Sequence, residues 1–356
     1  MKLFAGFFLF AFLASYSGKA QPGADSMLNF IKANKSKAAL YFVQNDTVLA
    51  RLNEDKLMPL ASTVKIMVAL EFAKQAAQNV FDKESLMPVS ELEKYYLPNT
   101  DGGMHPAWLA YESKQGHIKN DSISLNNVAR GMMMFSSNAN TEFLMDLLGL
   151  DNVKNNLQLL GIKQHTAIYP LVSSLFMYQN PNNKMEESIL KGIKKLSDEQ
   201  YSRYLYDMHK ALKYDTLLKT KFRPQDLSTK MQKAWSDRLT ASTVKEYAKI
   251  CNVINNRRYF SKETFEVLAG IMETIMENPA NRQLLQHAGM KGGSTPWVLT
   301  KAMYATTKDG NRIELAYFFN ELDPSDNLRM QLWMNDFELR ILMDKNFRKA
   351  LANYKF

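Results

Sequence analysis

Three short motifs carry side chains whose order along the chain suits acyl transfer. They are Ser62-Thr63-Val64-Lys65, Ser136-Ser137-Asn138 and Lys291-Gly292-Gly293-Ser294. A serine hydroxyl is a weak nucleophile at neutral pH unless a neighbouring base takes its proton. Taken singly, each motif also fits a structural role as a helix cap, a turn or a surface lysine. The prediction of chemistry therefore depends on the three motifs occurring together.

Ser62 and Lys65 are the predicted nucleophile and base. They are three residues apart in a stretch with helical apolar spacing, which puts both side chains on one helix face. Lys65 can accept the Ser62 proton in its neutral form, which burial or nearby cations would favour. At the start of a helix, the backbone N–H of Ser62 would also point toward developing negative charge.

The other two motifs supply a second hydroxyl, an amide and a cation. Ser136 could pass a proton to a leaving group, and Asn138 could hold a substrate amide. Lys291 precedes paired glycines, which let a substrate approach a strand edge closely, and its charge suits a carboxylate. The 5 histidines lack metal-ligand spacing, so we expect no metal, and we expect no other cofactor.

Together the motifs resemble the S-x-x-K, S-D-N and K-T-G set of the penicillin-recognising serine hydrolases, and class A β-lactamases most closely. The similarity extends around the motifs over residues 58–75, 123–148 and 239–321. The resemblance implies an acyl-serine intermediate formed with a small-molecule β-lactam or a cell-wall peptide.

The resemblance also implies a role for each motif residue. Ser62 would attack the acyl carbonyl, while Lys65 and Ser136 would move protons. Backbone N–H groups of Ser62 and Ser294 would form the oxyanion hole. The substrate-binding residues would be Asn138, Lys291, Gly293 and Ser294.

Two motif positions depart from the family pattern. Ser137 stands where the family has aspartate, a variation found among relatives. Gly292 stands where K-T-G has threonine, so a hydroxyl that helps to bind the substrate carboxylate is missing. Ser294 or Thr295 would have to replace it from the next positions.

The largest departure concerns hydrolysis of the acyl-enzyme. Class A β-lactamases use a loop glutamate about thirty-five residues past S-x-N to activate the deacylating water. The comparable stretch here, residues 166–175, contains no acid. Glu142, Glu186 and Glu187 are the nearest carboxylates, and we expect them to be solvated structural residues. No residue is assigned as the deacylation base.

Strand-like segments near both chain ends, with helices between, predict an α+β fold of the β-lactamase/DD-peptidase type. One antiparallel sheet built from both ends would be flanked by helices and joined to an all-helical subdomain. We expect a single catalytic domain over 21–356, with an α/β part at about 21–65 and 240–356 and a helical part at about 66–239. The expected elements are helices 25–34, 62–78, 125–148 and 327–354, and strands 38–42, 47–52, 297–306 and 312–319.

The sequence also supports predictions for two further segments and for the single cysteine. Residues 175–237 are polar and helix-prone, and they lengthen the chain relative to compact class A enzymes. His105-Pro106-Ala107-Trp108 is expected to be a packed loop, with a place on the pocket rim as the alternative. Cys251, the only cysteine, excludes an intramolecular disulfide and is expected to be a buried packing residue.

The N-terminus and the charge bear on location and partners. Lys2, the apolar run 3–13 and Gly18-Lys19-Ala20 predict a signal peptide over 1–20 and a periplasmic or secreted protein, with a retained anchor as the alternative. No later stretch is apolar for long enough to span a membrane. The net charge of +9 is spread along the chain, which favours solubility or attraction to anionic envelope polymers over nucleic acid. We expect a monomer.

Three functions stay open on the sequence alone. The first is a hydrolase for β-lactams, cell-wall D-alanyl peptides or another amide or ester. The second is a binding or sensor module that acylates, or only binds, without turnover. The third is an adhesin for envelope polymers on an inert scaffold. The absence of the loop glutamate favours the cell-wall and sensor alternatives over rapid β-lactam turnover.

Overall fold

The computed structural model describes residues 22–356 except 183, 216 and 355, so the predicted signal peptide lies outside the described residues. The described chain forms two compact units. Unit 1 comprises Val64–Gly161 and Thr166–Thr240, and unit 2 comprises the described residues up to Thr63, Ile162–His165 and Ala241–Phe356. Within residues 22–356, gaps aside, no helix has the length and apolar character needed to cross a membrane.

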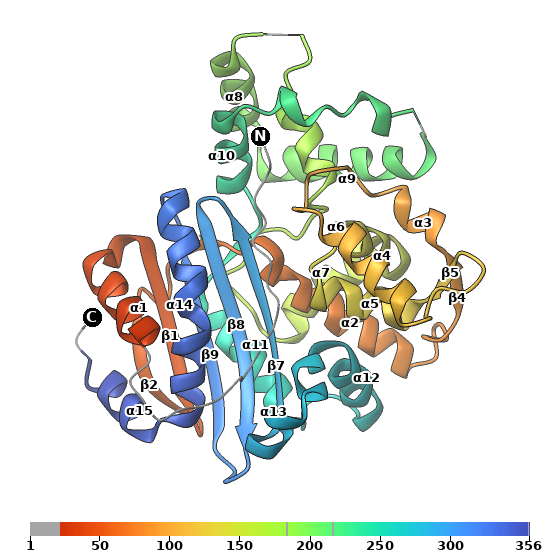
Figure 1. Cartoon of the computed structure of the whole chain (residues 1–356). Coiled ribbons are helices and arrows are strands. Elements are labelled where there is room, and N and C mark those ends of the chain that lie inside the picture. Colours follow the sequence, from red (N-terminus) through yellow and green to blue (C-terminus); the bar gives the residue numbers. More distant parts are fainter. Residues whose placement is uncertain (1–21, 183, 216, 355) are drawn as a thin grey trace. The chain divides into compact units, whose positions relative to one another are not determined.

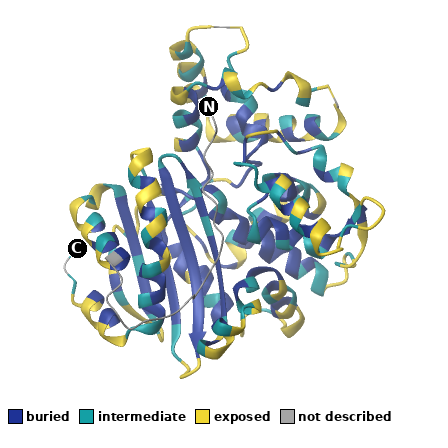
Figure 2. Ribbon diagram, viewed as in Figure 1, coloured by how far each residue is buried: buried dark blue, intermediate teal, exposed yellow. Residues whose placement is uncertain are grey.

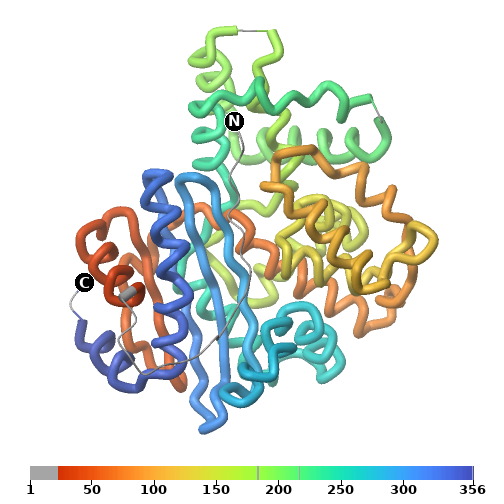
Figure 3. The backbone as a smooth tube through the Cα atoms, in the orientation of Figure 1, coloured from red at the N-terminus to blue at the C-terminus, as the bar shows by residue number. Residues whose placement is uncertain are grey.

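Unit 2 is built on a five-stranded antiparallel sheet with the strand order β2-β1-β9-β8-β7. Strand β1 from the start of the chain pairs with β9 near its end, so both chain ends contribute to the sheet, as predicted (Figure 3). Asn45 and Asp46 both have positive φ, which matches the two-residue turn of a β-hairpin. The strands are β1 (Ala38–Gln44), β2 (Thr47–Leu52), β7 (Leu285–Thr295), β8 (Val298–Thr307) and β9 (Arg312–Phe319).

Helices cover both faces of this sheet (Figure 1). Tyr317 and Phe318 are neighbours in β9, so their side chains point to opposite faces of the sheet. Tyr317 packs on Phe337 of α14 (Pro324–Met343). Phe318 packs on Tyr247 of α11 (Val244–Asn256). Every residue of β8 is therefore buried (Figure 2). The other elements of unit 2 are α1 (Pro22–Ala33), α12 (Lys262–Met272), α13 (Pro279–Leu284), α15 (Lys345–Ala352) and the short pair β3 (Met58–Pro59) and β6 (Ala241–Ser242).

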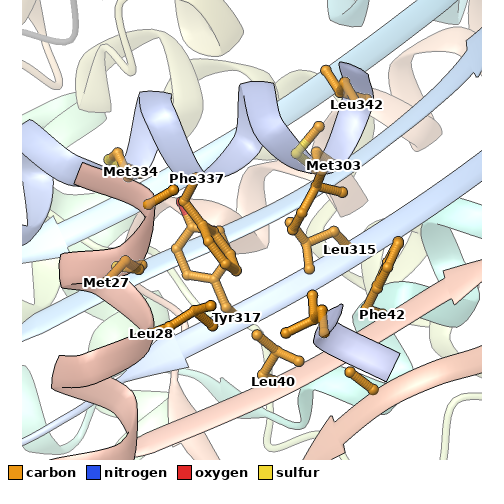
Figure 4. Close-up of a cluster of buried hydrophobic side chains, with 14 of the residues drawn as sticks. Met27, Leu28, Leu40, Phe42, Met303, Leu315, Tyr317, Met334, Phe337 and Leu342 are labelled. Carbon is orange, nitrogen blue, oxygen red and sulfur yellow. The ribbon is translucent and has the colours of Figure 1, made fainter. Parts of the chain in front are cut away.

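The main core of unit 2 lies between the sheet and α1, α14 and α15. Figure 4 shows side chains from these elements converging, with Met27 and Leu28 from α1 opposite Phe337 from α14. Leu40, Leu315 and Tyr317 contribute the sheet side of the same cluster. Burying these side chains supplies the main driving force for assembling the two chain ends into one unit.

The predicted closing helix 327–354 is wrong in one respect, because the chain breaks at Asp344 into α14 and α15. Asp344 leaves helical geometry, with φ −109° and ψ 101°. Its carboxylate accepts the backbone N–H groups of Asn346 and Phe347, at 2.9 and 3.0 Å, and so caps α15. Apolar periodicity continues across such a break, so the pattern alone did not reveal it.

Unit 1 is mainly helical, with one short ribbon of β4 (Leu86–Pro88) and β5 (Ser122–Ser124). Helix α2 (Lys65–Ala77) is almost entirely buried and packs against α5, α6 and α7. The remaining helices are α3 (Val89–Glu93), α4 (Met104–Lys114), α5 (Leu125–Met134), α6 (Asn138–Leu148), α7 (Leu150–Leu159), α8 (Glu186–Lys195), α9 (Asp198–Tyr214) and α10 (Thr229–Asp237).

Residues 105–108 were predicted to form a loop, but they lie in the first turns of α4. Pro106 suits that position because the first backbone N–H groups of a helix have no partner within it. Trp108 is buried against α5, where a Cβ on Gly131 would lie 2.5 Å from the Trp108 ring atom Cε2. The prediction of a packed loop is therefore wrong, because proline in the first turn of a helix is compatible with helical geometry.

The segment 175–237 folds onto the rest of unit 1 through helices α8, α9 and α10. Leu205 and Leu212 of α9 pack in one apolar cluster with Tyr95, Leu97 and Ala139 from outside the segment. Because the cluster is shared, the segment has no separate core of its own in the described chain.

Candidate active site

Lys65 is the centre of the first group of predicted site residues, which lies in unit 1. Its side chain is fully buried at the start of α2. The Lys65 Nζ donates to the Ser136 carbonyl oxygen at 2.6 Å and to Asn138 Oδ1 at 2.7 Å, and it lies 3.3 Å from Ser136 Oγ. The structure thus brings together three residues predicted from two separate motifs.

The turn between α5 and α6 presents these acceptors. Ser136 has φ +60°, a left-handed conformation that costs energy in a residue other than glycine. The next residue, Ser137, is the N-cap of α6, where its Oγ accepts the backbone N–H of Asn140 at 3.2 Å. Asn138 is the first residue of α6. The cap and the strained residue together fix where the acceptors lie.

Burial lowers the pKa of Lys65 from its ordinary value of 10.5 to about 7. The negative charges of Asp101 and Glu142 work in the opposite direction, but desolvation is the larger effect. A substantial fraction of Lys65 is therefore neutral near pH 7, as a general base must be.

Ser62 belongs to a second group of predicted residues, which lies in unit 2. It is partly exposed in a 3₁₀ turn, Ala61–Val64, and α2 begins only at Lys65. The expectation that Ser62 starts the α-helix is therefore corrected. Ala61 has φ +45°, and the Thr63 N–H donates to the Leu60 carbonyl oxygen at 3.0 Å, which tightens the chain there.

Gly293 lies against the backbone of this turn. A Cβ at Gly293 would be 2.5 Å from the Ser62 backbone nitrogen and 2.6 Å from the Leu60 carbonyl oxygen, so only glycine permits the approach. Thr300, its partner on β8, places its Oγ1 2.8 Å from the Leu60 carbonyl oxygen and 2.8 Å from Thr63 Oγ1. Sequence reasoning missed Thr300, since only the β7–β8 register brings it to Gly293.

The K-x-G motif lies inside β7, a strand that the sequence pattern did not predict and that precedes the predicted strand 297–306. Lys291 is buried, and its Nζ donates to the Gly292 carbonyl oxygen at 2.9 Å. Alternation along the strand puts Lys291 and Gly293 on one face and Gly292 and Ser294 on the other. Of the two proposed replacements for the missing hydroxyl, Ser294 rather than Thr295 shares the face of Gly292.

Comparison with known protein families decides the classification. A family profile described as "Beta-lactamase enzyme family" matches residues 24–328, which is most of the chain. The chain belongs to this beta-lactamase family. The predicted family resemblance is thereby confirmed.

Solved β-lactamase structures share the fold of this beta-lactamase-family chain and confirm the α+β prediction. A class A β-lactamase from Bacteroides cellulosilyticus is 17% identical, with a TM-score of 0.52 over 89% of this chain and 97% of that one. A β-lactamase from Chitinophaga pinensis is 14% identical, with a TM-score of 0.53 over 90% of this chain and 99% of that one. No curated protein sequence matches the chain.

The segment 166–175 is held by a carboxylate from α6. Glu142 is fully buried, which corrects the expectation that it is solvated. Its carboxylate accepts the N–H groups of Val172 and Ser173, the latter at 2.9 Å, and the Ser173 hydroxyl at 2.7 Å. His209 Nδ1 of α9 lies 3.0 Å from its Oε2. Glu142 therefore joins the loop and α9 to α6.

The other two nearby carboxylates lie on α8. Glu187 is exposed and forms an ion pair with Lys230, and Glu186 is partly exposed in the first turn of the helix. Both sit where a negative charge stabilises a helix N-terminus. Neither is among the groups described around Lys65.

Proposed function

We propose that the chain is an active-site-serine acyl hydrolase that forms an acyl-serine intermediate with a β-lactam or a related amide. The observation that carries the proposal is the buried Lys65, whose pKa of about 7 leaves it able to accept a proton at neutral pH. Lys65 follows Ser62 by three residues, and it contacts Ser136 and Asn138 from the second motif.

Acylation then proceeds in two steps. Neutral Lys65 takes the proton of the Ser62 hydroxyl while Ser62 Oγ bonds to the carbonyl carbon, which produces a tetrahedral oxyanion. The oxyanion collapses and breaks the carbon–nitrogen bond, and the leaving nitrogen takes a proton from Ser136, which Lys65 replaces. Asn138, Lys291 and Gly293 bind the substrate in this scheme, and the N–H groups of Ser62 and Ser294 hold the oxyanion.

A second candidate is an enzyme or sensor that acylates and releases the product slowly, as a penicillin-binding protein or DD-peptidase would. The loop 166–175 contains no acid. Glu142, the carboxylate that reaches this loop, already accepts three hydrogen bonds, and His209 Nδ1 lies 3.0 Å from its Oε2. A carboxylate whose lone pairs are occupied by donors is a poor base for water. These observations favour fast acylation followed by slow deacylation.

One experiment separates the two candidates. Residues 21–356 would be incubated with a fluorescent penicillin and with a chromogenic cephalosporin, beside Ser62→Ala and the control Ser36→Ala at an exposed serine. Rapid colour without lasting label supports a β-lactamase, and persistent label without colour supports a penicillin-binding enzyme or sensor. If the Ser62→Ala protein matches the unaltered chain with both reagents and with a serine-directed phosphonate, the proposed function is wrong.

We also propose that residues 1–20 direct export and that the mature protein is a periplasmic or secreted monomer. The sequence features given above support export, and the even distribution of charge is compatible with a soluble monomer. Fractionation of expressing cells with N-terminal sequencing tests the first part. Sedimentation of the purified protein tests the second.

A further inference from the structure

Behind the Ser136–Asn138 turn lies His105 of α4, whose side chain is fully buried. Its Nδ1 is 2.8 Å from Ser137 Oγ, and its Nε2 is 3.1 Å from Glu93 Oε1. The rings of Tyr96 and Trp108 pack against it, with centroids 4.9 and 5.5 Å away. The imidazole therefore connects the turn to a carboxylate that is itself partly exposed, with 39% of its side-chain surface accessible.

The hydrogen bonds of Ser137 determine which partner of the Nδ1 contact is the donor. The amide of Asn140 has a fixed orientation, because its Nδ2 donates to the Val128 carbonyl oxygen at 3.0 Å. Its Oδ1 therefore faces Ser137 and accepts the Ser137 hydroxyl proton at 2.9 Å. Ser137 Oγ also accepts the Asn140 N–H. With its only proton used, Ser137 Oγ can only accept from His105, so Nδ1 carries a hydrogen.

The other ring nitrogen faces a carboxylate. The hydrogen bond with His105 lowers the pKa of Glu93, so Glu93 is ionised and can only accept. Glu93 thus holds the other side of the ring, with its Oε1 3.1 Å from Nε2. Two more charged groups adjoin this pair: Lys219 donates to the Glu93 carbonyl oxygen, and the Asp101 carboxylate accepts the backbone N–H of His105 at 2.9 Å.

Ser137 lies between the two residues that supply all the acceptors described for Lys65. The left-handed conformation of Ser136 persists only while its surroundings hold it. We propose that His105, held between Ser137 and Glu93, is a positioning residue that anchors Ser137 and so holds the Ser136–Asn138 turn against Lys65. The inference rests on the proposed function, in which this turn orients Lys65 and relays a proton.

The first test measures the acylation rate constant with a fluorescent penicillin. His105→Ala should slow acylation by about tenfold to a hundredfold, because small displacements of catalytic groups cost that much. His105→Asn keeps an N–H donor near the Nδ1 position and should restore much of the rate. The matched control is His117→Ala, which removes a histidine that is 47% exposed and pairs with Glu112 just after the same helix. It should acylate at the rate of the unaltered protein.

The second test reads the ring of His105 directly by NMR of ¹⁵N-histidine-labelled protein. In the unaltered chain, Nδ1 should carry hydrogen, because it donates to Ser137 Oγ. Glu93→Gln keeps a polar partner for Nε2, so Nδ1 should keep its hydrogen. Because the bond to Ser137 then survives, Glu93→Gln should slow acylation far less than His105→Ala.

The outcomes separate the two proposals. If the unaltered protein acylates with no probe, the proposed function fails, and the ring spectrum still tests the hydrogen bond from Nδ1 to Ser137. If Nδ1 carries no hydrogen in the unaltered protein, that hydrogen bond is wrong and His105 does not anchor Ser137. If a folded His105→Ala protein acylates as fast as the unaltered one, His105 does not position the turn. If His105→Ala does not fold, Ser137→Ala replaces it in the test. Ser137→Ala removes the hydroxyl oxygen that accepts from His105 and should slow acylation to a similar extent.

Discussion

Lys65 combines two properties that oppose each other in most lysines. Its ammonium has three oxygen acceptors within hydrogen-bond reach, which favours the charged form. It is also fully buried, which favours the neutral form, and burial dominates. Lys65 therefore titrates near neutral pH while its Nζ stays within reach of three oxygen acceptors.

The acylation rate should therefore rise with pH through about 7, since only neutral Lys65 accepts the Ser62 proton. Below that pH the rate should fall about tenfold per pH unit. Penicillin labelling measured from pH 5 to pH 9 provides the check. Lys65→Arg should stay inactive across the range, because a guanidinium does not deprotonate there. A flat profile in the unaltered protein would show that another group is the base.

The same shift makes stability depend on pH. A lysine whose folded-state pKa lies below its unfolded value binds protons more weakly when folded, so the free energy of unfolding rises between about pH 7 and 10.5. Lys65→Met removes the buried charge and should raise the melting temperature, by more at pH 6 than at pH 9. Thermal unfolding at the two pH values measures this. An equal rise in melting temperature at pH 6 and pH 9 would contradict the lowered pKa of Lys65.

At the scale of elements, close helix packing positions α4, and with it His105. Trp108 of α4 lies over Gly131 of α5, where no larger residue fits without displacement. The Trp108 Nε1 donates to Glu112 Oε1 at 3.0 Å, so the indole has a polar partner within its own helix. This contact and the Asp101 cap at the backbone of His105 determine where α4 begins and how it lies on α5.

Gly131→Ala should destabilise the protein by about 1–3 kcal/mol, because the new methyl group would overlap the Trp108 ring. Gly192→Ala in α8 is the matched control, since no atom lies within 4 Å of its added Cβ. That change should be neutral or stabilise by up to about 1 kcal/mol through helix propensity. Urea unfolding of both variants gives the comparison. Equal effects at the two sites would argue against the packing described for Trp108.

Glu142 joins three elements, so its loss should loosen them together. Glu142→Gln leaves one acceptor oxygen for the polar groups that contact the carboxylate. The free energy of unfolding should therefore fall by about 2 kcal/mol or more. Amide exchange should accelerate at Val172, Ser173 and along α9. The control Glu187→Gln breaks an exposed ion pair with Lys230 and should change stability by less than about 1 kcal/mol. Unchanged exchange in Glu142→Gln would show that the loop is held by other contacts.

At the scale of the whole molecule, each unit buries a cluster of its own. Unit 2 buries apolar side chains on both faces of its sheet, and unit 1 surrounds α2 and shares a second cluster with the segment 175–237. Cys251 lies in α11 within unit 2 and is buried. The only thiol in the chain is thus a probe for the integrity of that unit.

Cys251 should not react with a thiol reagent until unit 2 unfolds. Burial raises the pKa of the thiol well above its ordinary value, so both access and the reactive thiolate are lacking. Labelling should follow the urea unfolding curve. Leu57→Cys, at a residue that is 50% exposed in the same unit, is the control and should react in the native protein. Rapid native labelling of Cys251 would contradict the packing of α11.

The sequence by itself determined much of the plan of this protein. The hairpin at Asn45-Asp46 and a helix after Ser62, which begins at Lys65, follow from local periodicity and turn chemistry. Strand-like segments near both chain ends predicted one shared sheet. The order of the three motifs was enough to predict the family, which the comparison confirms. The sequence pattern did not reveal the break at Asp344 or the helix that contains His105. Both depend on the conformation of a single turn, whereas apolar periodicity is averaged over several turns.

Only the tertiary structure decided how the motif residues are held. Ser136 and Asn138 reach Lys65 across some seventy residues of chain, and Thr300 reaches Leu60 across 240. The burial of Lys65 and Glu142, and the two partners of His105, depend on such long-range packing. The pKa of a side chain is set by desolvation and by neighbours in space. The sequence could therefore predict Lys65 as a base, while the burial that lowers its pKa to about 7 depends on the fold.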